Sequence, residues 1–347
     1  MSAPRVHEMA ALTALAGAPA GLSAGELIDQ LLTAGLTHAQ SLAALEAALS
    51  HNGLALTRET FALSTTGARS LLEFHGELEH ALDPSPSTPG MEDCPSLPWL
   101  TTVQTHWLDA LSLNYAVDAR ALAALLPAPL EPELHRGTAW VQVLASRLQE
   151  MRPQGTPALF GVNFHQVSFR AAVQYRNTQG TLRRGGYFVR SETDHPVLRA
   201  VGNALTEFKF HAFGLSTIAL ERRDHLLTFR TSSRLNDPMS TIDAELDCSR
   251  GDAAPAHSCW SSIDDLYEPL VECYDAFGVD PGRYVYVLTI DREPWKLRFA
   301  HPNRVAVRWM SEGPLKGARL DSALALAAPC AYRWRPLRRE RIAQGYP

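Results

Sequence analysis

Lysine is scarce in this sequence. Three of the 347 residues are lysines, Lys209, Lys296 and Lys316, so any reaction that requires a lysine amine has three candidates. The 32 basic and 37 acidic side chains give a net charge of -5. A chain with this balance has no overall attraction to nucleic acid or to an anionic membrane, so a role of that kind would have to be local.

Cysteine is also infrequent, and the five cysteines are far apart. They form no Cys-x-x-Cys pair and no cluster with histidine, which are the patterns of a disulfide framework or a structural zinc site. The sequence also lacks a glycine-rich phosphate loop and a Gly-x-Ser-x-Gly elbow. We therefore expect neither a metal nor a cofactor.

Long apolar runs are missing as well. No run approaches the roughly 20 residues of a membrane helix. The N-terminal stretch MSAPRVHEMAALTALAG is too short and too interrupted in its apolar part for a signal peptide. These features predict a soluble, cytoplasmic protein with no membrane partner.

Residues 1–82 have the pattern of a small, mainly helical domain. Three helices are expected first, the third at 37–50, followed by two short strands at 54–58 and 60–63 and by a last helix. This order, together with the stretch FALSTTGARSLLEF, resembles a winged-helix regulator. The resemblance implies DNA binding through the third helix.

The charge of this domain favours a different role. Residues 1–82 contain three basic and eight acidic side chains, and the expected third helix has no lysine or arginine. Because phosphate contacts dominate DNA affinity, such a helix would be a poor recognition helix. A module for dimerisation or for contact with a protein partner is the alternative to DNA binding.

The rest of the chain divides into a linker and a strand-rich domain. Residues 83–98, DPSPSTPGMEDCPSLP, contain five prolines and no periodicity, as expected of a linker. Residues 99–347 show many strand patterns without strand-helix alternation, which favours an α+β domain built on a barrel or sandwich over a doubly wound sheet. Strands are expected at 139–144, 163–175, 186–190, 208–220, 226–232, 284–290 and 305–309, helices at 119–126 and 264–277, and a polar excursion at 235–254.

Several segments between about residues 99 and 335 resemble the acetoacetate-decarboxylase-like superfamily, and within it an uncharacterised family of domains of unknown function. They are HWLDALSLNYAVDARALAALLP, GTAWVQVLASRLQEMRP, the Ser168-Phe169-Arg170 strand followed by GGYFVRSE, and EPLVECYDAF with REPWKLRFA. The resemblance implies a closed, double-cone-like β-barrel with a buried pocket for a small-molecule ligand.

The same resemblance directs attention to Lys209. The enzyme that names the superfamily decarboxylates a β-keto acid through a Schiff base on a lysine that has a second lysine beside it. The local counterpart, Glu207-Phe208-Lys209-Phe210, has one lysine, with Phe210 where the second is expected. Alternation would place Glu207, Lys209 and His211 on one strand face, with Glu207 as acid or base and His211 as proton shuttle. The other interpretation is the solvent face of an amphipathic strand.

A second candidate site lies on the strand expected at 163–175. Gln166, Ser168 and Arg170 alternate with apolar residues there, so all three would share one face. If that face lines the lumen, Arg170 could bind a carboxylate with its planar guanidinium, and Ser168 and Gln166 could contact the ligand. A structural ion pair is the alternative for Arg170. His165, on the opposite register, is expected to be a core histidine.

Two further expectations concern the last third of the chain. Trp295 is expected in the core and Lys296 on the surface. The basic residues between 333 and 341 are expected to form a solvated tail, the alternative being contact with nucleic acid or an acidic partner.

Three functions are consistent with these patterns. The first is a small-molecule-binding barrel that acts on or senses a small organic acid or carbonyl compound. The second is a ligand-responsive transcriptional regulator, and the third is a Schiff-base decarboxylase, a carbon-carbon lyase, that uses Lys209. The identity of the ligand and the oligomeric state, including a possible homo-oligomer, are not encoded in any recognisable motif.

Overall fold

The computed structural model describes residues 54–57, 60–63, 92–93, 102–154, 161–196, 198–199, 213–250 and 253–342. The helices expected in residues 1–82, the winged-helix interpretation and most of the expected linker lie outside these ranges. So do Glu207, Lys209 and His211. The two short strands expected before residue 64 are confirmed, because β1 (Leu54–Thr57) and β2 (Thr60–Leu63) pair as an antiparallel hairpin.

In the described part of the chain, the remaining strands belong to one 16-stranded sheet. They are β3 (Glu92–Asp93), β4 (Val103–Val117), β5 (Glu131–Pro132), β6 (Leu134–His135), β7 (Thr138–Pro153), β8 (Val162–Arg176), β9 (Leu182–Thr193), β10 (Phe213–Arg223), β11 (Leu226–Ser233), β12 (Ile242–Asp247), β13 (Asp275–Asp280), β14 (Tyr284–Arg292), β15 (Leu297–Val307), β16 (Arg319–Leu326), β17 (Cys330–Trp334) and β18 (Arg338–Arg341). The described helices are short: α5 (Ala119–Ala123), η3 (Pro238–Ser240), α7 (Ile263–Leu266), the π-helix η4 (Tyr267–Val271) and α8 (Arg308–Glu312).

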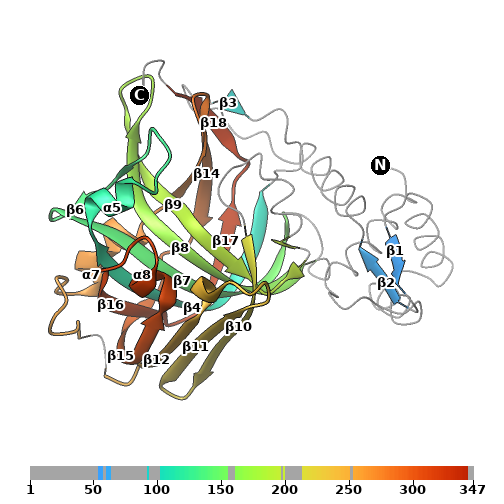
Figure 1. The fold of residues 1–347 in the computed structure, drawn as a ribbon, viewed down its shortest axis with the longest axis vertical. Helices are drawn as coiled ribbons and strands as arrows, with labels where there is room; N and C mark the ends of the chain where they lie inside the picture. Colours follow the sequence, from blue (N-terminus) through green and yellow to red (C-terminus); the bar gives the residue numbers. More distant parts are fainter. Residues whose placement is uncertain are drawn as a thin grey trace.

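Four long strands, β4, β7, β8 and β9, form the centre of this sheet (Figure 1). Strand β9 pairs with β8 along one edge, and along the other edge with β13 near Gly186 and with β10 near Ser191. Strand β4 likewise pairs with β7 on one side and with β17 and then β16 on the other.

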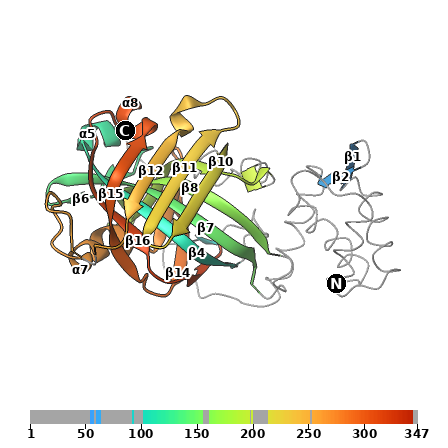
Figure 2. The same cartoon turned by 90° about the horizontal axis from the view of Figure 1, so that it is seen from below.

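The strand pairings therefore form two circuits that share β4, β7, β8 and β9. One circuit continues through β10, β11, β12, β15 and β16, and the other through β13, β14 and β17. Figure 2 shows β10, β11, β12 and β15 side by side, in yellow to orange. Each circuit places a different set of side chains against the shared strands.

The shared strands are buried on both faces. On β7, Val141 and Val143 pack into one hydrophobic cluster, whereas Trp140 and Leu144 pack into a second. Burying one large apolar side chain contributes about 1.5–3 kcal/mol, so both faces stabilise the fold. Strand β16 is buried at every position from Asp321 onward, and a strand of that kind has no hydrophobic alternation by which it could be recognised.

The polar excursion expected at 235–254 is wrong in its centre, where β12 pairs with both β11 and β15. Ile242, Ala244 and Leu246 are buried, while the acidic residues between them are less so. The alternation is that of a strand with one face in the core. The acidic residues of this stretch made the alternation hard to recognise in the sequence.

The expected solvated tail is also wrong. Strand β17 pairs with β14 and β4, and β18 pairs with β14 and β3. Glu340 in β18 is 1% exposed, accepts a 2.5 Å hydrogen bond from the Tyr175 hydroxyl and forms a 2.8 Å ion pair with Arg183. The arginines of this run thus lie in β17 and β18 or between them, and three of them are exposed as expected: Arg333, Arg335 and Arg341.

Several element boundaries differ from expectation: for example, the strand expected at 139–144 extends to Pro153, and the one expected at 186–190 begins at Leu182 and ends at Thr193. The helix expected at 264–277 is α7 followed by η4, and β13 begins at Asp275. The strand expected to reach residue 309 ends at Val307, where α8 begins. Trp295 is buried and Lys296 is exposed, as expected.

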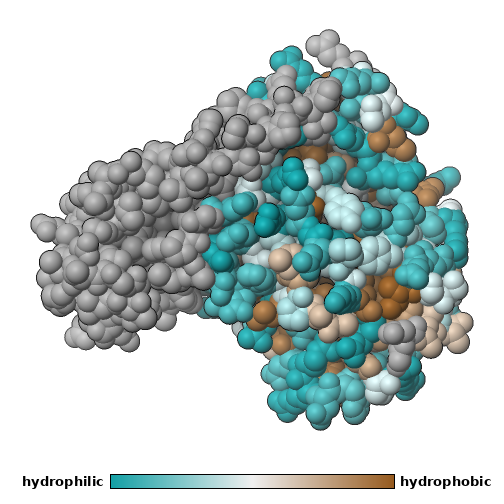
Figure 3. All heavy atoms as spheres, turned by 180° about the vertical axis from the view of Figure 1, so that it is seen from behind, coloured by the Kyte–Doolittle hydropathy of each residue, from teal (hydrophilic) through white to brown (hydrophobic). Residues whose placement is uncertain are grey.

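The face shown in Figure 3 is mostly hydrophilic where the structure is described, and its apolar residues occur in small separate groups. Scattered apolar side chains of this kind are normal on a protein surface. Among the described helices, none is long and apolar enough to span a membrane.

Candidate functional site

The central feature of the candidate site is Arg170, in the middle of β8. Its neighbours Phe169 and Ala171 point to the opposite face and are completely buried in the core. A bulge between Phe169 and Arg170 shifts the pairing of β8 with β9. Gly186 lies under the arginine stem, because a Cβ at that position would be 2.8 Å from the Arg170 Cδ. The absence of a side chain there makes room for Arg170.

The Arg170 guanidinium is held by neutral acceptors. Its Nε donates to Gln142 Oε1 at 3.0 Å, and its Nη2 donates to the same oxygen and, at 2.8 Å, to the carbonyl of Leu270. Arg170 is 6% exposed, yet no described carboxylate pairs with it. Burial of a charge without a charged partner costs free energy, so an anion that pairs with Arg170 would stabilise it.

A chain of amides and hydroxyls fixes Gln142 in this orientation. Its Nε2 donates to Ser112 Oγ at 3.1 Å and to Asn114 Oδ1 at 2.9 Å. The amide of Asn114 in turn donates to Ser322 Oγ at 3.1 Å. Because every member of this network is neutral, it directs an oxygen toward Arg170 without cancelling the positive charge.

Arg170 and Gln142 line a cleft of about 150 Å³, here called the Arg170 cleft. Glu133 and Arg184 contribute to its lining, and so do several residues between Glu268 and Cys273. The cleft therefore combines a buried cation with acidic groups from separate elements.

The electrostatics of the cleft are uneven. Burial raises the pKa of Glu133, with a smaller increase from the nearby Glu268 and an opposing effect of Arg184, whose Nε lies 3.3 Å from the Glu133 carboxylate. Burial also raises the pKa of the Cys273 thiol, and its Sγ lies 3.3 Å from the Asp275 carbonyl. Cys273 is thus held as a thiol, which is a weak nucleophile.

The π-helix η4 forms one wall. The amide of Glu272 donates to the Tyr267 carbonyl at 2.8 Å, a bond across five residues. The carbonyls of Leu270 and Val271 at its end accept from Arg170 and Arg292. π-Helical turns are rare and are often found at functional sites.

Of the three residues predicted from the sequence to bind a ligand, the structure places one in the lining of the cleft. Arg170 lines the cleft, whereas Ser168 and Gln166 lie farther along the same face of β8 and are not part of the lining. They contact each other through a 3.1 Å hydrogen bond from Gln166 Nε2 to Ser168 Oγ. His165 is not a core residue, because its Nδ1 lies 2.7 Å from Asp194 and its side chain is 26% exposed.

Sequence reasoning did not find Gln142, Glu133, Glu268 or Cys273. Gln142 and Glu133 lie before the strand of Arg170 in the chain, and Glu268 and Cys273 lie about 100 residues after it. The one available signal was the segment EPLVECYDAF, which the resemblance singled out without assigning a role. In the described part of the chain, no group of three or more His, Cys, Asp or Glu residues is arranged to hold a metal ion.

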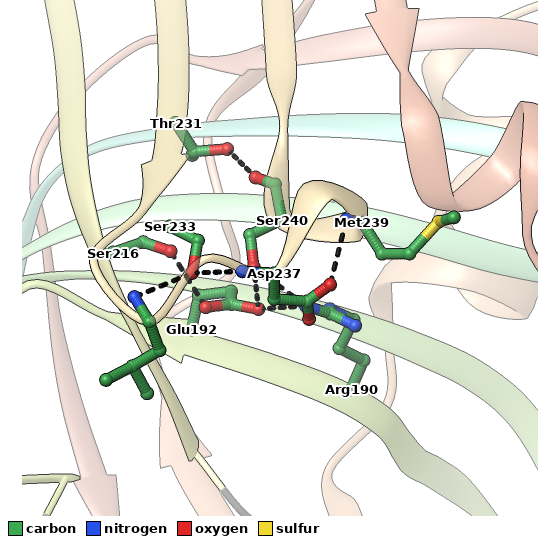
Figure 4. Close-up of polar contacts among 9 residues, drawn as sticks. Arg190, Glu192, Ser216, Thr231, Ser233, Asp237, Met239 and Ser240 are labelled. Atoms are coloured by element: carbon green, nitrogen blue, oxygen red, sulfur yellow. Dashed lines mark hydrogen bonds and ion pairs between the residues drawn. The ribbon is translucent and has the colours of Figure 1, made fainter.

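A second polar cluster lies where β9 pairs with β10, and Figure 4 shows the Arg190 guanidinium beside the carboxylates of Asp237 and Glu192. The Nη2 of Arg190 is 2.5 Å from an oxygen of each carboxylate. Glu192 is 2% exposed and also accepts from Ser216 at 2.8 Å and from Ser240 at 2.9 Å. The cluster connects the end of β9 to β10 and η3, at the two ends of the segment that contains Lys209.

These features define the class: a β-sheet protein in which two strand circuits share four strands, with a buried arginine in a small polar cleft. The chain belongs to the DUF2071 family of uncharacterised conserved proteins, whose model matches residues 104–330.

One curated relative is the uncharacterised protein YqjF of Bacillus subtilis (strain 168). It is 28% identical over 195 residues, which is 56% of this chain and 74% of YqjF. Similar solved structures include an acetoacetate decarboxylase-like enzyme from Sphingomonas wittichii RW1, with 12% identity and a TM-score of 0.48, over 70% of this chain and 94% of that one. Acetoacetate decarboxylase from Legionella pneumophila is 13% identical, with a TM-score of 0.46 over 77% and 95%.

Proposed function

We propose that this protein binds a small organic acid in the Arg170 cleft, with the carboxylate of the ligand on the Arg170 guanidinium. We also propose that the two strand circuits form the closed double barrel expected from the sequence. The observation that supports the binding role most strongly is a 6% exposed arginine whose described partners are all neutral.

The geometry of Arg170 suits a carboxylate. Nε and Nη2 are occupied by Gln142 and Leu270, while Nη1 donates to no other described residue. A guanidinium N–H that faces a cleft forms short, charge-assisted hydrogen bonds with a carboxylate oxygen. In a site of low dielectric such a bond is stronger than in water.

The volume of the cleft limits the ligand. A cleft of about 150 Å³ is smaller than the roughly 300–1,000 Å³ of pockets that bind drug-sized ligands. This size favours an acid with a short carbon chain.

Titration calorimetry with acetate, propanoate and butanoate tests the proposal, with butanamide as the uncharged analogue. We expect butanoate to bind and butanamide to bind at least about tenfold more weakly, a difference of about 1.4 kcal/mol. Arg170→Met should abolish binding of all three acids. Arg308→Met is the matched control, because Arg308 is exposed and pairs with Glu312 away from the cleft. Equal binding of butanoate by wild type and Arg170→Met would contradict the proposal.

A Schiff-base lyase that uses Lys209 is the second candidate. Lys296 and Lys316 are both exposed, so a buried amine for imine formation has to come from Lys209. Borohydride reduction in the presence of a β-keto acid, read by peptide mass spectrometry, should then place an adduct on Lys209. Lys209→Arg should remove the adduct, and an adduct confined to the two exposed lysines would exclude this mechanism.

A further inference from the structure

We propose that the ligand of the Arg170 cleft is an amino carboxylic acid, with its carboxylate on Arg170 and its ammonium group beside Glu133 and Glu268. This inference rests on the proposed function and narrows it from small acids in general to acids that also carry a positive charge.

The charges that line the cleft do not balance internally. Three carboxylates, Glu133, Glu268 and Glu272, face two guanidinium groups, Arg170 and Arg184. Arg184 pairs with Glu133 at 3.3 Å, but Arg170 pairs with no described carboxylate. The cleft therefore contains one unmatched positive group and two unmatched negative groups among its described residues.

The positive and negative groups are arranged in depth. Arg170 is 6% exposed and is anchored to the Leu270 carbonyl at the end of η4. Glu268 lies in the same wall, two residues before Leu270 in the chain, and is exposed. A ligand that enters the cleft thus meets carboxylates at the mouth and the guanidinium inside it.

Glu133 and Glu268 are close enough to influence each other. The charge of Glu268 adds to the effect of burial in raising the pKa of Glu133. Groups of the cleft also act on Cys273: burial is the main cause that raises the pKa of its thiol, Arg170 lowers that pKa, and Glu133 makes a smaller contribution that raises it. A cationic group placed between the two carboxylates would relieve their repulsion while the opposite end of the ligand neutralises Arg170.

A ligand with only a carboxylate would satisfy half of this arrangement. It would neutralise Arg170 but leave Glu268, which pairs with no described cation, without a positive partner at the mouth of the cleft. A simple amine would relieve the carboxylates and leave the buried guanidinium unmatched. A short molecule with both groups satisfies both, and its size agrees with a cleft of about 150 Å³.

Titration calorimetry on the full chain at pH 7 tests the inference with matched probes: 4-aminobutanoate against butanoate, β-alanine against propanoate, and butylamine alone. We expect each amino acid to bind about tenfold more tightly than its matched acid, from attraction to two carboxylates in a partly desolvated site. Glu268→Gln should reduce this preference about threefold and leave butanoate affinity nearly unchanged. Glu221→Gln is the control, since Glu221 is exposed and pairs with Arg223 on β10.

The outcomes separate the two proposals. If butanoate binds as tightly as 4-aminobutanoate and depends on Arg170, the cleft binds organic acids but the preference for an amino group is wrong. If 4-aminobutanoate binds more tightly and Glu268→Gln leaves that preference intact, the position assigned to the ammonium group is wrong. If none of the acids binds, the proposed function itself fails and this inference fails with it.

Discussion

Replacement of Gln142 by leucine tests how strongly the neutral network supports Arg170. The change keeps the approximate size of the side chain and removes Oε1, the acceptor of two N–H groups of Arg170. Arg170 would keep one described acceptor, the carbonyl of Leu270. A 6% exposed guanidinium would then lie in the core with most of its donors unsatisfied.

The size of the effect follows from the burial of the charge. Gln142 is a neutral partner, and loss of a hydrogen bond to a charged group costs about 1.5–3 kcal/mol. In a domain of roughly 150–250 residues a loss of 1 kcal/mol lowers Tm by about 2–4 °C. We therefore expect Gln142→Leu to lower Tm by roughly 5–8 °C.

A double-mutant cycle distinguishes this explanation from simple loss of packing. Arg170→Met alone leaves the Gln142 oxygen without its donor, at a cost of about 1–3 kcal/mol. The double variant Arg170→Met/Gln142→Leu removes both partners, so its loss of stability should be smaller than the sum of the two single losses. A residual loss remains, because Ser112, Asn114 and the Leu270 carbonyl each lose a donor. Urea denaturation of the four proteins measures the coupling. Additive losses in the double variant would refute the reasoning.

Three further predictions concern the Arg190 cluster and the mouth of the cleft. A Cβ on Gly214 would lie 2.2 Å from a carboxylate oxygen of Glu192, so Gly214→Ala should lower the free energy of unfolding by about 1–3 kcal/mol. Urea denaturation measures this loss, and an unchanged midpoint would show that the cluster rearranges at little cost in free energy. The hydrogen bond from Arg190 holds the pKa of Asp237 below its usual value, so its contribution to stability is present at neutral pH and lost as pH falls through the folded-state pKa. Asp237→Asn should therefore lower Tm at pH 7 more than at pH 3, and equal losses at both would contradict this. Burial raises the pKa of Glu133. The free energy of unfolding should therefore fall as pH rises from the unfolded-state pKa through the folded-state pKa. Glu133→Gln should flatten the Tm profile over that pH range, and an unaltered profile would contradict this.

The sequence predicted β8 and its alternation correctly, and it identified Arg170 because Gln166, Ser168 and Arg170 alternate with apolar residues along that strand. It could not assign the environment of Arg170. Gln142 reaches it from β7, and the Leu270 carbonyl reaches it from a segment 100 residues away in the chain. Contacts of that kind depend on the order of strands in the sheet, which local patterns do not specify.

The errors have a physical origin as well. Strand β16 is buried on both faces and shows no alternation, so nothing in its sequence marked it as a strand. Strand β18 looked like a solvated basic tail because its partners, Tyr175 and Arg183 for Glu340, come from β8 and β9. The apolar residues between Asp264 and Leu270 have helical spacing, which predicts a regular helix. That spacing does not reveal the π-helical hydrogen bond from the Glu272 amide to the Tyr267 carbonyl.

A crystal structure of the protein grown with butanoate tests the central claim most directly. We expect a carboxylate oxygen about 2.7–2.9 Å from Arg170 Nη1, the distance of a charge-assisted hydrogen bond. An Arg170 guanidinium already paired with a carboxylate of the chain itself, and a cleft that contains only water, would contradict the account.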